Sequence, residues 1–95
     1  MVDQYDEFPV GDMTVNGLFT LTENIADNGG LAVAYDAYKR YEKEKGLTKQ
    51  RLPGFKGTFS GDQLFFMSAA NIWCTNVRPE KAESLLRTDT HSPGF

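Results

Sequence analysis

The sequence has one cysteine, one histidine and one tryptophan among its 95 residues. Because Cys74 is the only cysteine, no disulfide bond can form within the chain. No stretch approaches the roughly 18 consecutive apolar residues that a membrane-spanning helix needs. The first residues, Met1 to Glu7, are acidic and lack the basic and apolar regions of a secretory signal. Taken alone, these absences suggest a cytosolic protein or an internal piece of a larger one.

A strong excess of one charge is also missing, since the formal net charge is only −3 at pH 7. This mild negative charge argues against nucleic acid or an anionic membrane as the main partner. The basic residues between positions 39 and 45 alternate with Glu42 and Glu44, which is typical of the solvated face of a helix. With 40% hydrophobic and 24% charged residues, the composition is that of a soluble protein, and the length allows one domain.

The N-terminal region is predicted to be irregular and extended. The first dozen residues are polar and punctuated by glycine and proline, as in a loop. Residues 13–21 favour extended structure, with Asn16-Gly17 as a turn between two short segments. A helix is predicted from about Glu23 to Lys45, with the Thr22 hydroxyl capping its first amides and Gly46 ending it.

Two further helices are indicated by their start signals. Ser60 and Gln63 have the spacing of a capping box, which predicts a helix that continues to about Cys74. Pro79 at a first helical position predicts a short third helix to about Arg87, followed by an irregular tail. Residues 47–58 contain proline and two glycines and are predicted to be a loop. The sequence therefore predicts a mainly α fold of about three helices with a short extended N-terminal segment.

Two carboxylates near the start of the first long helix are candidates for chemistry. Glu23 and Asp27 are four residues apart, so they lie on one face of a helix and repel each other unless a cation or separate partners intervene. A metal site is one solution, with Glu23 as ligand and Asp27 orienting another ligand. The alternative is that acidic residues near a helix start are favoured by the helix dipole alone. Gly29 and Gly30 follow within the helix, which indicates close packing against another element.

Two blocks of the sequence are distinctive, and shorter blocks lie between them. The two are Glu23-Asn24-Ile25-Ala26-Asp27-Asn28-Gly29-Gly30 and Asp89-Thr90-His91-Ser92-Pro93. The shorter ones are Leu52-Pro53-Gly54, Gln63-Leu64-Phe65-Phe66, Trp73-Cys74 and Arg78-Pro79-Glu80. In this order, over nearly the whole chain, they resemble the neprilysin and endothelin-converting-enzyme family of zinc endopeptidases. The resemblance implies that residues 1–95 are a partial peptidase domain, similar to the C-terminal portion of a zincin-type catalytic domain.

The resemblance implies a role for each candidate residue. Glu23 matches the family's third zinc ligand, and Asp27 matches an aspartate that hydrogen-bonds a zinc-binding histidine. His91 matches a histidine that stabilises the oxyanion of the tetrahedral intermediate, and Asp89 matches a carboxylate that orients it. On the residues alone, a single histidine in an irregular tail is more often a surface residue. Cys74 matches a cysteine bonded to one far upstream, whereas on the residues alone it is a small buried side chain or a thiol with an outside partner.

The same resemblance implies what these 95 residues lack. A chain with one histidine has no HExxH helix, so two zinc ligands and the general base are missing, as is the family's final C-terminal segment. We therefore expect a chain that is inactive alone, supplies one Zn²⁺ ligand, and needs the missing N-terminal part to act on peptides. The family implies the extracellular face of the plasma membrane, or secretion. Helix faces left uncovered should bring poor solubility or dimerisation; the candidates are Phe65, Phe66, Ile72 and Trp73.

Two other interpretations remain open. The chain could be a stand-alone, non-catalytic protein that binds a partner such as a full-length homologue, or an unrelated small helical protein. Genomic context separates the first two readings, because an upstream exon encoding HExxH supports a partial peptidase. Peptide specificity is not predicted, since the pockets lie mainly in segments outside this chain.

Overall fold

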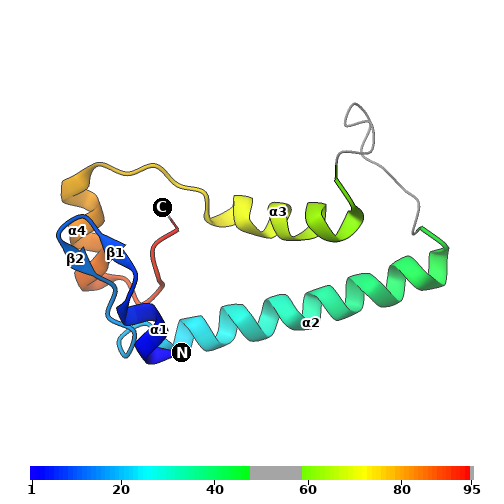
Figure 1. The fold of residues 1–95 in the computed structure, drawn as a ribbon, viewed down its shortest axis with the longest axis horizontal. Coiled ribbons are helices and arrows are strands. Elements are labelled where there is room, and N and C mark those ends of the chain that lie inside the picture. The colour runs from blue at the N-terminus through cyan, green and yellow to red at the C-terminus, as the bar shows by residue number, and fades with distance from the viewer. Residues whose placement is uncertain (48–58, 95) are drawn as a thin grey trace. The chain divides into compact units, whose positions relative to one another are not determined.

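The structure is a computed structural model that describes residues 1–47 and 59–94. Its elements, labelled in Figure 1, are α1 (Val2–Asp6), β1 (Pro9–Val10), β2 (Met13–Thr14), α2 (Leu21–Lys45), α3 (Gly61–Trp73) and α4 (Pro79–Thr88). They divide into two compact units, Met1–Gly29 with Trp73–Phe95, and Gly30–Ile72. The prediction of a mainly α fold is confirmed. The predicted loop over residues 47–58 lies, apart from Leu47, outside the described residues.

The N-terminal loop prediction is wrong, because the chain begins with a short helix. The N–H of Tyr5 donates to the carbonyl of Met1 at 3.1 Å, and α1 follows from Val2. The Asp6 carboxylate then accepts the N–H of Gly17 at 2.7 Å. Gly17 is buried, and a Cβ built there would collide with the carbonyl oxygen of Val2. A contact between distant residues, absent from the local sequence pattern, thus holds this helix in place.

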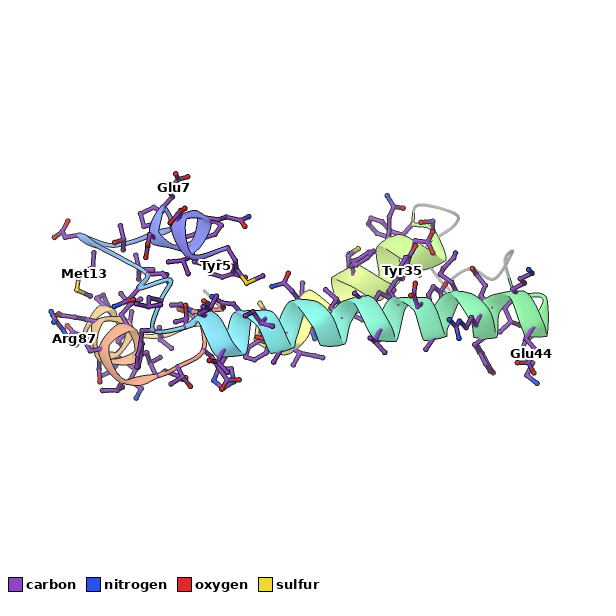
Figure 2. All side chains as sticks on the ribbon, turned by 90° about the horizontal axis from the view of Figure 1, so that it is seen from below. Tyr5, Glu7, Met13, Tyr35, Glu44 and Arg87 are labelled. Atoms are coloured by element: carbon purple, nitrogen blue, oxygen red, sulfur yellow. The ribbon has the colours of Figure 1, made fainter. Side chains whose placement is uncertain are left out.

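A two-residue turn at Gly11-Asp12 connects the two short strands, which pair antiparallel in the register Pro9↔Thr14 and Val10↔Met13. Gly11 has φ +60°, as the first central position of a type II′ hairpin requires. The predicted hairpin turn at Asn16-Gly17 is therefore wrong. The hairpin lies beside α4, where an Arg87 guanidinium nitrogen donates to the sulfur of Met13 at 3.5 Å (Figure 2).

Helix α2 begins two residues earlier than predicted, and Thr22 does not cap it. The Asn16 side chain accepts the N–H of Phe19 at 2.9 Å, which shapes the turn before the helix. The Thr20 carbonyl then accepts the N–H of Asn24 at 2.9 Å, so the helical hydrogen bonds start before Thr22. The helix ends at Lys45 as predicted.

The stop signal at Gly46 is confirmed. Gly46 has φ +65°, a conformation that glycine adopts without steric cost. Its N–H donates to Lys43 O at 3.4 Å, and the N–H of Leu47 donates to Glu42 O at 2.9 Å. These two bonds form a Schellman motif, which satisfies carbonyls at the helix end.

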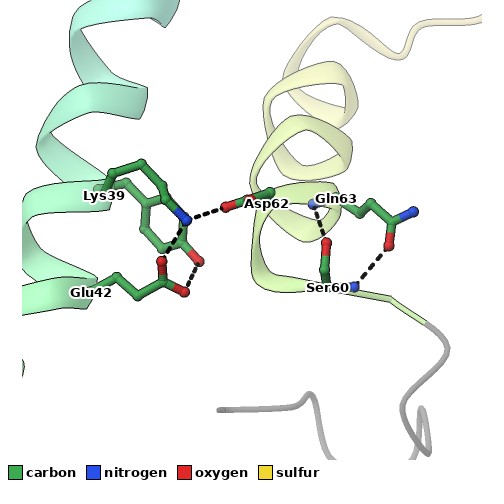
Figure 3. A network of polar contacts seen from close by, with 6 residues as sticks. Lys39, Glu42, Ser60, Asp62 and Gln63 are labelled. Atoms are coloured by element: carbon green, nitrogen blue, oxygen red, sulfur yellow. Dashed lines mark hydrogen bonds and ion pairs between the residues drawn. The ribbon is translucent and has the colours of Figure 1, made fainter. Parts of the chain in front are cut away.

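The capping box of α3 is confirmed in both directions (Figure 3). The Ser60 hydroxyl accepts the N–H of Gln63 at 3.2 Å, and the Gln63 side chain accepts the N–H of Ser60 at 2.8 Å. Across from it, Lys39 on α2 donates to Asp62 at 2.8 Å and to Glu42 at 2.6 Å. This network ties the second half of α2 to the start of α3.

Aromatic side chains pack the same two helices together. The Tyr35 and Tyr38 rings lie 5.3 and 5.4 Å from the ring of Phe65, and Tyr35 lies 5.0 Å from that of Phe66. Phe65 is consequently half-buried, but Phe66 keeps 46% of its surface exposed. Exposed apolar side chains were predicted at four positions; the prediction is confirmed at Phe66, Ile72 and Trp73 and is wrong at Phe65.

The expected packing around Gly29 and Gly30 is not observed in the described part of the chain. A Cβ built at either glycine has no neighbouring atom within 4 Å. Helix α4 begins with Pro79 as predicted and ends one residue later than predicted, at Thr88. None of the helices within residues 1–47 and 59–94 combines the length and apolar character needed to cross a bilayer.

Candidate active site

The candidate residues belong to two segments of the first unit. Glu23 and Asp27 lie on the first turns of α2. Asp89 and His91 lie in the segment directly after α4, where the helix has ended and the backbone at Asp89 is extended. Glu23 and His91, 68 positions apart in the sequence, are thus brought together by the packing of this unit.

His91 contacts a carboxylate through each of its two ring nitrogens. Nδ1 lies 3.0 Å from Oδ1 of Asp89, and the backbone N–H of His91 donates to the same oxygen at 2.9 Å. Nε2 lies 3.4 Å from Oε2 of Glu23. Because Asp89 holds both the ring and the backbone of His91, the ring is oriented with Nε2 toward Glu23. The structure therefore brings together three of the four residues that the sequence singled out.

The electrostatics of this cluster favour a positively charged imidazole. The hydrogen bond to Asp89 raises the pKa of His91 above its ordinary value, and the negative charges of Glu23 and Asp27 act in the same direction, while desolvation opposes them. Conversely, the backbone N–H of His91 and then its ring lower the pKa of Asp89. A protonated His91 has a donor on each nitrogen, so Nε2–H can donate to an anionic oxygen.

Asp27 differs from the other three residues. Its side chain is exposed, and it forms no hydrogen bond or ion pair with the residues that the structure describes. It acts on His91 only through its charge. The proposed role of Asp27, which involves a partner outside this chain, stays a prediction.

An open hollow of about 170 Å³ lies next to His91, and Trp73, Thr75, Leu85 and Pro93 are among the residues that line it. The rings of Trp73 and His91 are 5.7 Å apart and tilted by 36°. A Cβ built at Gly94 would collide with the carbonyl oxygen of Trp73, so a glycine is needed where the chain passes this residue. One face of His91 therefore lies against an aromatic ring.

The sequence analysis missed two polar residues, each next to a candidate residue. Asn24 follows Glu23 and is only 2% exposed, and Ser92 follows His91. The Ser92 hydroxyl donates to Oδ1 of Asn24 at 2.7 Å. Both residues lie within the two distinctive sequence blocks, which could have drawn attention to them, although neither residue type is itself characteristic of the chemistry.

The metal-binding capacity of this site is limited. Within residues 1–47 and 59–94, no group of three or more histidine, cysteine, aspartate and glutamate side chains is arranged to hold a metal ion. The Glu23 carboxylate, 35% exposed, is accessible as a single ligand. Cys74 is exposed and unpaired in this chain, so of the two alternatives left open by the residues the small buried side chain is wrong, and a thiol with a partner outside the chain stays a prediction.

Comparisons with known proteins identify the family of the chain. The chain is 48% identical over 97 residues to neprilysin of Homo sapiens, 48% over 93 residues to endothelin-converting enzyme 1 of Bos taurus, and 42% over 95 residues to neprilysin-21 of Caenorhabditis elegans. These alignments cover 97–99% of this chain but 12% of each relative. An unrelated small helical protein is thereby excluded. The sequence profile described as peptidase family M13 matches residues 1–95, and the chain belongs to this family.

Proposed function

We propose that the chain is one part of the catalytic domain of a neprilysin-like zinc metalloendopeptidase, which hydrolyses peptide bonds. The position of His91, between Asp89 and Glu23 and with a raised pKa, is the observation that supports this most directly. Membership in peptidase family M13 supports the same reaction class.

In this proposal Glu23 is one zinc ligand. The zinc ion, when bound, would supply a Lewis acid and a water of lowered pKa. His91 donates from Nε2 to the oxygen on which negative charge develops, and Asp89 holds the imidazole in the orientation that this requires. Asp27 orients a histidine ligand contributed from outside this chain.

The remaining parts of the site come from elsewhere in a larger protein. With one histidine in the sequence, the other two zinc ligands and a general base must lie outside these 95 residues, so the chain alone is inactive. Its partners are the rest of the catalytic domain and, in the assembled enzyme, peptides. Cys74 pairs with a cysteine of that missing part, outside the cell or at the external face of the plasma membrane.

An exchange experiment tests this function. Residues 1–95 replace the segment of Homo sapiens neprilysin that they match, and peptide hydrolysis is measured by kcat and KM. We expect an active chimera in which Glu23→Gln abolishes zinc-dependent activity and His91→Ala lowers kcat about a hundredfold or more, as for the loss of an oxyanion donor. Ser84→Ala, on the exposed side of α4, is the control and should be without effect. An inactive chimera, or a fully active Glu23→Gln variant, would contradict the proposal.

A further inference from the structure

A partly buried chain of hydrogen bonds runs from Ser92 through Asn24 to Asn16. The Ser92 hydroxyl donates to Oδ1 of Asn24 at 2.7 Å, and Nδ2 of Asn24 donates to the Thr20 hydroxyl at 2.9 Å. The Thr20 hydroxyl in turn donates to the carbonyl of Asn16 at 3.1 Å. Asn24 and Thr20 are only 2% and 3% exposed.

This chain of bonds has one direction throughout. Each hydroxyl or amide in it donates once toward the N-terminus, so the orientation of the Asn24 amide is fixed by its two neighbours. Leaving a buried polar group of this kind without its partner is unfavourable, which makes the arrangement strongly preferred once it has formed. The buried side chains therefore give Ser92 one defined position relative to α2.

That position sets the geometry of the candidate active site. Ser92 directly follows His91 in the sequence, and Asn24 directly follows Glu23. The hydrogen bond between Ser92 and Asn24 therefore joins the neighbours of His91 and Glu23. Glu23 and His91 themselves are only 3.4 Å apart, and their side chains are 35% and 42% exposed. On the other side, Asp89 fixes the rotation of the imidazole but comes from the same segment as His91 and does not tie it to α2.

We propose that Asn24 and Ser92 are positioning residues, which hold the segment carrying His91 in register with Glu23. The inference rests on the proposed function, because the register matters for catalysis only if Glu23 binds zinc and His91 donates to the oxyanion. Neither residue touches the substrate. Their loss moves the donor away from the place where negative charge develops, and a displacement of about 1 Å at such a group costs up to about a hundredfold in rate.

Kinetics of the chimera described above test the proposal. We expect Ser92→Ala to lower kcat about tenfold while KM stays within about twofold, since the donor acts mainly in the transition state. Ser92→Thr keeps the hydroxyl and should recover kcat to within about threefold of the unsubstituted chimera. Ser84→Ala is the matched control, with the same atoms removed from an exposed site of the same unit. A merely structural role for Ser92 would alter the yield or melting temperature without this change in kcat.

The outcomes separate the two proposals. If Glu23→Gln abolishes activity and Ser92→Ala leaves kcat unchanged, positioning by Ser92 is refuted and the proposed function stands. If Glu23→Gln is active, the proposed function fails first. NMR on the 95-residue chain gives a second measurement independent of activity. The nuclear Overhauser effect between the imidazole of His91 and the side chain of Glu23 on α2 should disappear in Ser92→Ala and persist in Ser92→Thr, and its persistence in Ser92→Ala would overturn the inference.

Discussion

Alanine at Gly30 is expected to stabilise α2 in this chain. Gly30 lies in the interior of α2, and an added Cβ meets no atom within 4 Å. Because the site is open, the substitution changes only the helix propensity, and replacing glycine by alanine inside a helix gains about 1 kcal/mol. The gain comes largely from the unfolded chain, which loses conformational freedom when glycine is replaced. We therefore expect a higher midpoint of urea denaturation and a stronger helical circular dichroism signal.

Gly46→Ala is the matched control on the same helix, and its effect should have the opposite sign. Gly46 has φ +65°, a conformation that costs a residue with a Cβ about 1–2 kcal/mol. The free energies of unfolding of the two variants should therefore differ by about 2–3 kcal/mol. If Gly30→Ala lowers the denaturation midpoint of the 95-residue chain, an element must pack against this glycine, and the reasoning from open space is refuted.

Three further predictions concern the capping box, the ion pair and zinc. Ser60→Ala should destabilise α3 by about 1 kcal/mol. The double variant Ser60→Ala/Gln63→Ala should lower the free energy of unfolding by less than the sum of the two single variants, as urea denaturation followed by circular dichroism will show. The hydrogen bond from Lys39 lowers the pKa of Asp62 in the folded chain. The contribution of Asp62 to stability is therefore present above the unfolded pKa and is lost as the pH falls through the lower, folded value. Asp62→Asn should remove this acid sensitivity below about pH 4, as denaturation midpoints measured at several pH values will show. Isothermal calorimetry should find only weak zinc binding to the isolated chain, because Glu23 is not part of a set of three ligands among the residues that the structure describes. A sub-micromolar dissociation constant would contradict this.

Helix boundaries were predictable where one residue and its immediate neighbours determine the structure. Ser60 with Gln63, Gly46 and Pro79 each mark a helix end through bonds or backbone angles that span at most a few residues. Such signals act within one turn of a helix, so the sequence contains all the information that they need. Their agreement with the structure follows from this short range.

The N-terminal region was mispredicted because its structure depends on more distant contacts. Helix α1 is held by the bond from Gly17 to Asp6, 11 residues apart, and nothing in residues 2–6 alone identifies it. The hairpin turn forms at Gly11-Asp12 and not at Asn16-Gly17, although both dipeptides are suited to tight turns. The buried position of Gly17 against Val2 decides between them, and a local pattern does not reveal it.

The candidate site likewise has a part that a local sequence pattern indicates and a part that it does not. The spacing of Glu23 and Asp27 indicated a charged helix face, but only the family resemblance connected it with His91. The bond from Ser92 to Asn24 was not predicted at all, since a serine and an asparagine far apart in the sequence carry no pairing signal. Their pairing follows from the packing of one unit, which brings the start of α2 to the segment after α4.

The separation of 68 residues between Asn24 and Ser92 also sets a delay between their synthesis on the ribosome. At about 5–20 residues per second, the ribosome adds Ser92 roughly 3–14 s after Asn24. Helix formation takes about a microsecond, so α2 has time to form long before its partner segment has been made. During those seconds the Asn24 amide is bonded to water or to transient partners. The register of Glu23 and His91 can thus be set only after Ser92 has been made, and a pause of the ribosome between the two segments would prolong the interval in which this helix face is open to other chains.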